Sequence, residues 1–343
     1  MEPHSTRTTL KTIAELVGCS ETTVSRVLNG KATQYRISDH TAHEIHRVAK
    51  ENKFSPNNLA RSLRTQRTLT LGLVIPDISN PFFSSIARHI EREARKLGYS
   101  IMLVDTEEET ELEEQSVTLL HQRNIDGLII SPVGQSVAHL EALFEQHIPI
   151  VIIDRFFPNS KIPYVASDNY AGAKEAVSFL ISQGHTRIAC IQGLPYTAPN
   201  NDRVRGFIDA FREFNLTADM DLIVGDSFGE ENGYLEMKLL LKRQDPPTAV
   251  FALSNLISLG ILRAVKEENL SVPEDVSLIA FDEQPYLSYL SPPLTTVAQQ
   301  NTEMGRMAIK MLFQQIQSTT KMQSQGIVLP TVLIKRHSVK SLA

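Results

Sequence analysis

The chain has 343 residues, of which 42% are hydrophobic and 21% charged, and its net charge is −5. A chain of this length can bury two or three cores, and no apolar run reaches the ~18 residues that a membrane-spanning helix needs. Because Cys19 and Cys190 lie far apart and no secretory signal opens the chain, the sequence excludes a disulfide framework and a thiolate zinc site, and we expect a reducing cytoplasm.

Charge is distributed unevenly along the chain. Residues 1–67 hold 11 of the 34 Lys and Arg residues but only 6 of the 39 Asp and Glu residues, so this segment carries +5 and the remainder carries −10. A basic head before an acidic body predicts that the head binds an anionic polymer, whereas a chance fluctuation in a short segment is the plainer alternative.

The start of the chain has the pattern of a small helical domain. Thr9 is suited to cap a helix over residues 10–17, which Gly18 can end because glycine tolerates a positive φ. Ser20 is suited to cap a second helix over residues 21–28, and a third capped helix follows. A helix, a tight glycine turn and a capped helix together predict a helix-turn-helix domain.

The second of these helices has an unusual polar face. An ordinary surface helix carries long charged side chains, but this one carries short hydroxyls and amides around a single arginine, Arg26. Short groups let a backbone approach a surface closely, and an arginine can donate two hydrogen bonds to guanine. The pattern predicts a helix that lies in the major groove of DNA, with an ordinary helical subdomain as the alternative.

Residues 10–30, LKTIAELVGCSETTVSRVLNG, resemble the N-terminal signature of the lactose-repressor/galactose-repressor family of bacterial transcription regulators. Thr12 departs from the Asp that is usual there. The resemblance implies that Glu21, Thr22 and Arg26 face base edges, where an acid can accept a hydrogen bond from cytosine N4. The other DNA contacts that we expect are the phosphate-holding Ser20, Thr23, Ser25 and Asn29, together with Thr9 and Arg36.

Residues 56–69 are predicted to form a hinge helix and linker. Pro56 suits the first turn of a helix, and a helix of roughly eight residues is not stable alone in water. In the family, this hinge folds against its dimer mate on operator DNA and wedges a leucine into the minor groove, which kinks the duplex. The resemblance assigns the wedge to Leu63, with Asn57 and Ala60 beside it; a plain basic linker is the alternative.

From residue 70 onward, apolar β-rich runs alternate with helical patterns, which predicts an α/β fold of parallel sheets flanked by helices. The main predicted strands are residues 70–76, 100–105, 126–131, 149–154, 187–193, 249–254, 276–282 and 327–336. The predicted helices are residues 82–97, 111–124, 136–147, 170–183, 203–215, 231–242, 256–269 and 302–317. Two such series predict two lobes, about 70–162 plus 293–322 and 163–292 plus 323–343.

Ligands of such sheets bind beyond the carboxyl ends of the strands, and these ends are rich in groups that recognise hydroxyls. Acids accept from paired hydroxyls, Arg and Asn donate, and aromatic rings stack on a sugar. The segments NPFF (80–83) and IIDR (152–155) resemble the ribose-binding periplasmic proteins. This resemblance assigns an effector pocket to Asn80, Phe82, Phe83, Asp154, Arg155, Arg203, Asp282 and Gln299, with Ser254 as a weaker candidate where the family commonly has Asn.

Each of these assignments has a structural alternative. The two phenylalanines also fit a core, Arg203 and Asp282 also fit an ion pair between the lobes, and residues 154–155 also fit a surface turn. Residues 225–229 match the G-x-S-x-G pattern of serine hydrolases, but the only later histidine is His337, close to the end of the chain. A free sugar-binding transport protein would share the two-lobed fold but lack the basic head.

The sequence therefore predicts a cytoplasmic, sequence-specific transcription regulator, a repressor rather than an enzyme, which joins the nucleoid when it is bound to double-stranded operator DNA. A small sugar or sugar phosphate is expected to release or promote DNA binding, and no metal or cofactor is expected. Because the chain stops soon after its last predicted strand without leucine heptads, we expect a homodimer on a near-palindromic operator. The predicted domains are residues 1–55, 56–69 and 70–343.

Overall fold

The computed structural model describes residues 8–52, 54, 67–318 and 326–342. The chain forms two compact units, a head (Met1–Thr68) and a body (Leu69–Ala343). The hinge residues Asn57, Ala60 and Leu63, which the sequence assigns to the minor groove, lie outside the described residues.

The helices of the head begin where the sequence predicts. They are α1 (Leu10–Val17), α2 (Glu21–Leu28), the 3₁₀ turn η1 (Thr33–Tyr35) and α3 (Asp39–Glu51). Thr9, Ser20 and Ser38 each accept a hydrogen bond from an amide three residues further on, so all three caps are confirmed. Thr12 accepts from the amide of Thr9 at 3.4 Å, which closes a capping box without the Asp that the family usually has.

All three helices contribute to the core of the head. The buried residues are Ile13, Ala14, Val24, Val27, Ile45, Val48 and Ala49. Because Val24 and Val27 turn inward, Glu21, Thr22 and Arg26 turn outward and are exposed. The polar face of α2 is therefore free to meet a partner.

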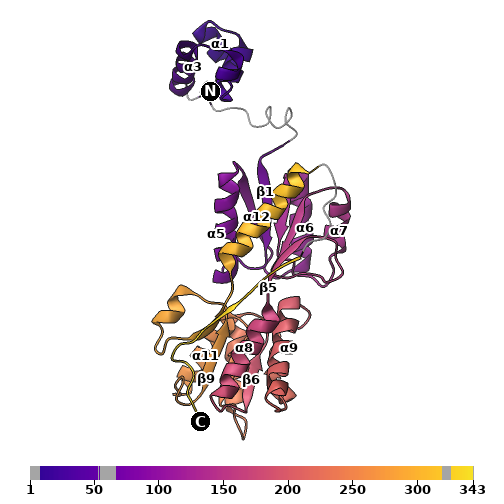
Figure 1. The fold of residues 1–343 in the computed structure, drawn as a ribbon, viewed down its shortest axis with the longest axis vertical. Helices are drawn as coiled ribbons and strands as arrows, with labels where there is room; N and C mark the ends of the chain where they lie inside the picture. The colour runs from indigo at the N-terminus through magenta and orange to yellow at the C-terminus, as the bar shows by residue number, and fades with distance from the viewer. Residues whose placement is uncertain (1–7, 53, 55–66, 319–325, 343) are drawn as a thin grey trace, which may run out of the picture. The chain divides into compact units, whose positions relative to one another are not determined.

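The first lobe of the body contains a six-stranded parallel sheet. In spatial order its strands are β11 (Gly326–Leu329), β5 (Tyr164–Ser167), β4 (Ile150–Ile153), β3 (Gly127–Ile130), β1 (Thr70–Ile75) and β2 (Ser100–Asp105). Its flanking helices are α5 (Pro81–Lys96) and α12 (Asn301–Gln317) on one face and α6 (Thr110–Gln122) and α7 (Ala138–Glu145) on the other (Figure 1). Both faces of the sheet are covered, as the apolar strands predict.

The second lobe repeats this arrangement. Its strands, in spatial order, are β12 (Val332–Ile334), β10 (Thr295–Ala298), β9 (Ser277–Phe281), β8 (Ala249–Ala252), β6 (Ile188–Ile191) and β7 (Ile223–Val224), and only β12 runs antiparallel to its neighbour. Its helices are α8 (Asn169–Ser182) and α9 (Ala198–Glu213) on one face and α10 (Glu230–Leu241) and α11 (Asn255–Glu267) on the other. Two 3₁₀ turns, η2 (Met220–Leu222) and η3 (Pro285–Tyr289), complete it.

The structure corrects the predicted lobe boundaries at three short strands. β5 and β11 pair with each other in the first sheet, and β10 pairs with β9 in the second sheet. The strand predicted over residues 327–336 is two strands in different sheets, which separate at Pro330 because proline lacks the N–H that a continuous ladder needs. Apolar patterns mark a strand but do not specify which sheet edge it joins.

Three chain segments cross between the lobes and are bonded to one another. The amide of Asp168 donates to the carbonyl of Leu329 at 2.8 Å, and Nε2 of Gln300 donates to the carbonyl of Pro330 at 2.9 Å. A side chain on Gly172 would place its Cβ 2.4 Å from Oγ1 of Thr331, so only glycine lets these segments pack this closely. The crossovers therefore form one bundle that links the lobes.

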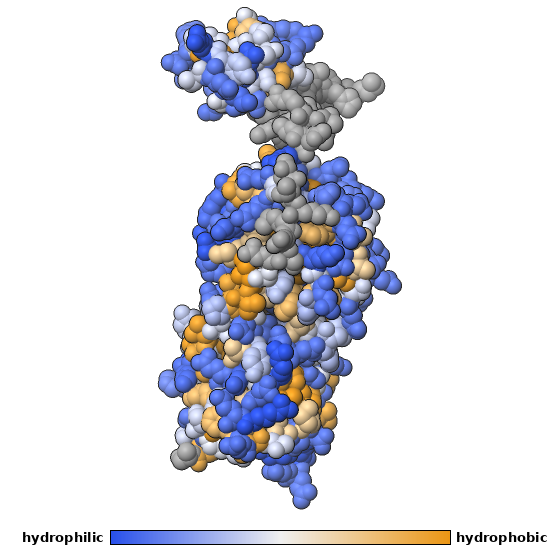
Figure 2. All heavy atoms as spheres, turned by 45° about the vertical axis from the view of Figure 1, so that its right-hand side comes forward, coloured by the Kyte–Doolittle hydropathy of each residue, from blue (hydrophilic) through white to orange (hydrophobic). Residues whose placement is uncertain are grey.

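The visible face of the body is largely hydrophilic, with smaller apolar groups among the polar residues (Figure 2). Within the described ranges, no helix is long and apolar enough to cross a membrane.

Candidate functional site

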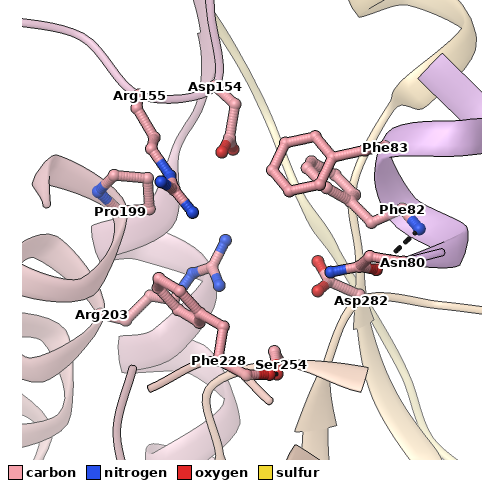
Figure 3. Close-up of a pocket in the computed structure, with 10 residues that line it drawn as sticks. All are labelled: Asn80, Phe82, Phe83, Asp154, Arg155, Pro199, Arg203, Phe228, Ser254 and Asp282. Carbon is pink, nitrogen blue, oxygen red and sulfur yellow. Dashed lines mark hydrogen bonds between the residues drawn. The ribbon is translucent and has the colours of Figure 1, made fainter. Parts of the chain in front are cut away.

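A pocket between the two lobes of the body gathers most of the predicted effector-binding residues (Figure 3). It is lined by Asn80, Phe82, Phe83, Asp154, Arg155, Pro199, Arg203, Phe228, Ser254 and Asp282. Of the predicted set, Gln299 alone does not line it, because its side chain is turned to Asp282. The strand ends thus converge as the sheet geometry predicts.

Asp154 directly follows strand β4 and has its backbone in the left-handed region, at φ 61°. The amide of Arg155 donates to the carbonyl of Ile153 at 2.7 Å, which makes a tight three-residue turn around Asp154. This strained turn aims the carboxylate into the pocket, where it is only 4% exposed. Burial raises the pKa of Asp154 to about 6, although the positive charges of Arg203 and Arg155 act to lower it.

Within the described part of the chain, Oδ1 of Asp154 has no hydrogen-bond partner. A buried carboxylate oxygen without a donor is costly, and a ligand that donated a hydrogen bond to this oxygen would remove that cost. A sugar hydroxyl is a donor of the required kind.

Asp282 occupies the matching place in the second lobe, directly after β9, with φ 75° and the same 4% exposure. Its Oδ1 accepts a hydrogen bond of 2.6 Å from Nε2 of Gln299. Burial raises the pKa of Asp282, while Arg203 and Gln299 favour its charged form. Gln299 is therefore a support for the pocket, although the sequence predicts it as a pocket-lining residue.

Arg203 projects from α9 and is held on three sides. Its Nε donates to Oδ1 of Asn169 at 2.8 Å and its Nη1 to the carbonyl of Leu253 at 2.6 Å. Its guanidinium carbon lies 3.7 Å from the ring centre of Phe281, and burial lowers the pKa of Arg203. A buried arginine fixed in this way presents a constant positive charge to Asp282.

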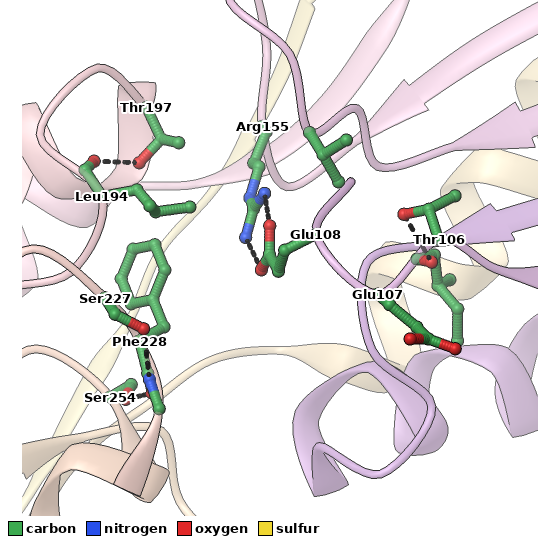
Figure 4. A network of polar contacts seen from close by, with 12 residues as sticks. Thr106, Glu107, Glu108, Arg155, Leu194, Thr197, Ser227, Phe228 and Ser254 are labelled. Atoms are coloured by element: carbon green, nitrogen blue, oxygen red, sulfur yellow. Dashed lines mark hydrogen bonds and ion pairs between the residues drawn. The ribbon is translucent and has the colours of Figure 1, made fainter. Parts of the chain in front are cut away.

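Arg155 is fixed by an ion pair within the first lobe. Its Nη1 and Nη2 donate to the two carboxylate oxygens of Glu108 at 2.6 and 2.5 Å (Figure 4). Glu107 and Glu108 both have positive φ values, 51° and 60°, in the turn that follows β2. The two-point geometry fixes the plane of the guanidinium at the edge of the pocket.

The amide oxygen of Asn80 and the hydroxyl of Ser254 are already engaged within the protein. Oδ1 of Asn80 accepts from the amide of Phe82 at 3.0 Å and from Nδ2 of Asn255 at 3.3 Å, which joins the lobes. The hydroxyl of Ser254 donates to the carbonyl of Phe228 at 2.9 Å and caps α11. Ser254 is thus hydrogen-bonded within the protein, and the sequence offers it only as a weaker candidate for the pocket.

The free space among the lining side chains is small. It measures about 20 Å³, and a water molecule needs roughly 10–15 Å³ by the same measure. A sugar therefore fits only if the lobes separate or side chains move. An adjoining cavity of about 250 Å³ shares Arg155 and is lined by aromatic Phe156, Phe157 and Tyr196, among others.

Sequence reasoning missed three residues at this site. Phe228 lies in the loop before α10, where no strand-end rule points to it, and Pro199 lies in the first turn of α9, which begins five residues before the predicted helix. Glu108 follows β2 at the kind of position that identified Asp154, so the same rule could have found it.

The G-x-S-x-G segment has an ordinary turn structure. Oγ of Ser227 accepts a hydrogen bond from the amide of Gly229 at 3.2 Å. Asn232 donates to the carbonyl of Ser227 at 2.5 Å, which closes the loop before α10. Among the residues that the structure describes, no group of three or more His, Cys, Asp or Glu side chains could hold a metal ion.

The predicted DNA-contacting residues of the head form an exposed or half-exposed set on α2 and its flanks. Ser20 and Thr23 share a hydroxyl contact of 2.9 Å, and Nδ2 of Asn29 donates to the carbonyl of Ser25 at 2.6 Å. These bonds fix the two ends of α2. The remaining predicted contacts are the exposed Thr9, Glu21, Thr22, Arg26 and Arg36.

Known proteins resemble both units. Residues 9–57 match the family model of bacterial regulatory proteins of the lacI family, and residues 177–339 match that of the periplasmic binding protein-like domain. The chain is 36% identical over 339 residues to the HTH-type transcriptional regulator DegA of Bacillus subtilis (strain 168), a match that covers 98% of this chain and 99% of the relative. The chain belongs to the lacI family of bacterial regulatory proteins.

Two further comparisons extend over nearly the whole chain. The HTH-type transcriptional repressor CytR of Escherichia coli (strain K12) is 33% identical over 341 residues, 99% of this chain and 98% of the relative. A solved structure of the transcriptional regulator CelR–cellobiose complex is 29% identical, covers 97% of this chain and 100% of its own, and has a TM-score of 0.73. The chain is a DNA-binding transcriptional regulator, which excludes the hydrolase and the transport protein.

Proposed function

We propose that a small sugar or sugar derivative binds between Asp154 and Asp282 and thereby changes the affinity of the head for operator DNA. The observation that carries this proposal is Oδ1 of Asp154, which lies in a pocket that both lobes line and has no partner within the described residues. A ligand that contacts both lobes favours the separation at which it reaches the side chains of both, and this preference is the source of control.

The head supplies the DNA contacts in this proposal. Glu21, Thr22 and Arg26 read base edges in the major groove, and the groups at the ends of α2 hold phosphates. Residues 56–69 connect the DNA-binding domain (1–55) to the effector domain (70–343), with Leu63 as the minor-groove wedge. Support comes from the exposed polar face of α2 and from the match to the lacI family over residues 9–57.

We infer further that two copies act together as a homodimer on the bacterial chromosome in the cytoplasm. A two-fold dimer presents two heads to two half-sites, and this doubles the contacts on a near-palindromic operator. Sedimentation analysis of the full chain at micromolar concentration should give a dimer mass, and a monomer mass in the presence of operator DNA would contradict the inference.

A thermal-shift screen of the full chain tests the effector site. The panel contains pentoses, hexoses, their phosphates and disaccharides, because the cavity beside Arg155 has room for a second unit. A sugar that binds only the folded protein at about 100 times its Kd stabilises it by roughly 2.7 kcal/mol.

The Asp154→Ala variant should lose this shift, whereas the surface control Asp245→Ala should keep it. A sugar that raises the melting temperature of both variants equally would show that the effector site lies elsewhere. A panel in which no sugar shifts the wild type would contradict the sugar proposal.

A further inference from the structure

Arg26, the proposed base reader of α2, has an aromatic neighbour. Its guanidinium carbon lies 3.9 Å from the ring centre of Tyr35, close enough for a cation–π contact on the face of the ring. Both residues are exposed. Tyr35 comes from η1, the turn between α2 and α3, and was not among the residues that the sequence assigned to DNA.

The chain fixes Tyr35 at this place by backbone bonds. The amide of Lys31 donates to the carbonyl of Arg26 at 2.9 Å, and the amide of Tyr35 donates to the carbonyl of Lys31 at 3.2 Å. The amide of Ile37 then donates to the carbonyl of Ala32 at 3.0 Å. The turn is therefore continuous with the end of α2, and the ring is held relative to Arg26.

Packing does not account for the ring. Tyr35 is 44% exposed and does not belong to the core of the head, whereas Ala32 and Ile37 of the same turn pack against that core. The turn is thus anchored by its small and aliphatic residues. Within the described residues, Arg26 is the one cation that lies over the ring of Tyr35.

The geometry leaves the arginine free to bind a base. Within the described residues, no acceptor takes a hydrogen bond from the guanidinium of Arg26, so its N–H groups remain available while the ring lies beside it. Arg155 of the body shows the opposite case, because Glu108 occupies its two terminal nitrogens. Tyr35 therefore restricts the motion of Arg26 without occupying its donors.

We propose that Tyr35 is a positioning residue that holds Arg26 ready for one base pair of the operator and so sharpens sequence preference. This proposal rests on the proposed role of α2 in reading DNA. A cation–π contact at an exposed site changes an equilibrium constant by about two- to fivefold. Two half-sites multiply the effect, so the loss on a full operator should be roughly fourfold to twenty-fivefold.

The test begins with a pool of random-sequence DNA duplexes, from which the full-length wild type selects its preferred sequence. Affinities are then measured for Tyr35→Leu, Tyr35→Phe and Arg26→Ala on this duplex, on its single-base-pair variants and on random DNA. Tyr35→Phe keeps the ring and should remain within about twofold of wild type. Tyr35→Leu should lose affinity mainly at the base pair where Arg26→Ala loses discrimination, with little change on random DNA.

A double-mutant comparison completes the design, because a residue that acts through Arg26 has no effect once Arg26 is gone. Tyr35→Leu in the Arg26→Ala background should therefore bind like Arg26→Ala alone. If Tyr35→Leu lowers operator affinity in the Arg26→Ala background by its full factor, the proposal is overturned in favour of a direct phosphate contact of the tyrosine. Equal losses of affinity for Tyr35→Phe and Tyr35→Leu would overturn it in the same way. Wild-type affinity and preference for Tyr35→Leu would also overturn it.

Failure of the underlying function has a different signature. If Arg26→Ala keeps the wild-type preference, or if the wild type selects no sequence, then α2 does not read bases through Arg26 and both proposals fail together. Equal melting temperatures of the five proteins, expected for exposed side chains, show that the affinities report on binding.

Discussion

Asp154 and Asp282 occupy equivalent places in the two lobes but have different surroundings. Each follows a buried strand, each has a positive φ, and each is 4% exposed. Gln299 donates a hydrogen bond to Asp282, whereas Oδ1 of Asp154 has no partner within the described residues. The repeated fold thus supplies two similar positions. The side chains around them donate a hydrogen bond to one carboxylate and leave the other available to a ligand.

The largest expected effect comes from removing the available carboxylate. In Asp154→Ala, the sugar loses hydrogen bonds to a charged group, each worth roughly 1.5–3 kcal/mol, so its affinity should fall by about 100-fold. Calorimetry with the sugar identified by the thermal-shift screen measures this loss. Operator affinity without sugar should stay close to wild type, and a parallel loss of operator binding would contradict a role confined to the effector.

The next effect concerns stability and pH. Burial raises the pKa of Asp154 to about 6, so between about pH 4 and pH 6 the folded state binds more protons than the unfolded state, and the free energy of unfolding falls as the pH rises. Asp154→Asn removes the titrating carboxyl and with it this fall in the free energy of unfolding. The variant should therefore be more stable than wild type at pH 7 by about 2–3 kcal/mol, with no gain near pH 4. Urea unfolding at both pH values measures the difference.

Asp282→Asn is the matched variant for this experiment. Its gain at pH 7 should be smaller, because the hydrogen bond from Gln299 favours the charged form of Asp282, whereas Oδ1 of Asp154 has no donor within the described residues. Equal gains for the two variants would show that the two carboxylates do not differ as their hydrogen bonds indicate.

A smaller effect is expected on the first-lobe arginine. Glu108→Gln replaces one of the two acceptors of Arg155 and removes the charge, so the guanidinium should become less ordered. Sugar affinity should fall by about tenfold, or roughly 1.4 kcal/mol. The neighbouring Glu107→Gln is the control, and an equal loss in both variants would indicate a general charge effect.

The smallest expected effect on sugar affinity is at the support of Asp282. Gln299→Leu removes the 2.6 Å hydrogen bond to a buried carboxylate, which should lower the free energy of unfolding by about 1–2 kcal/mol. Sugar affinity should change less than in Asp154→Ala, because Gln299 does not line the pocket. A larger loss of sugar affinity in Gln299→Leu than in Asp154→Ala would reverse the comparison between the lobes.

The sequence predicted those parts of the fold and site that depend on local patterns. Helix caps such as Ser20 and strand ends such as Asp154 and Asp282 follow from residue types within a few positions, and the structure places them as expected. Pairing between distant segments is not a local property. For this reason the predicted sheet membership of β5, β10 and β11 was wrong, and the contact of Tyr35 with Arg26 was not predicted.

The central claim is that sugar and operator are linked through the body, and reciprocal titration tests it most directly. Linkage requires the factor by which saturating sugar changes the operator Kd to equal the factor by which operator changes the sugar Kd. We predict equal factors of about fivefold or more for the wild type, a range typical of allosteric coupling. Asp154→Ala, at the same sugar concentration, should show no change in operator Kd. An operator Kd that does not respond to bound sugar in the wild type, or an undiminished response in Asp154→Ala, would contradict the account.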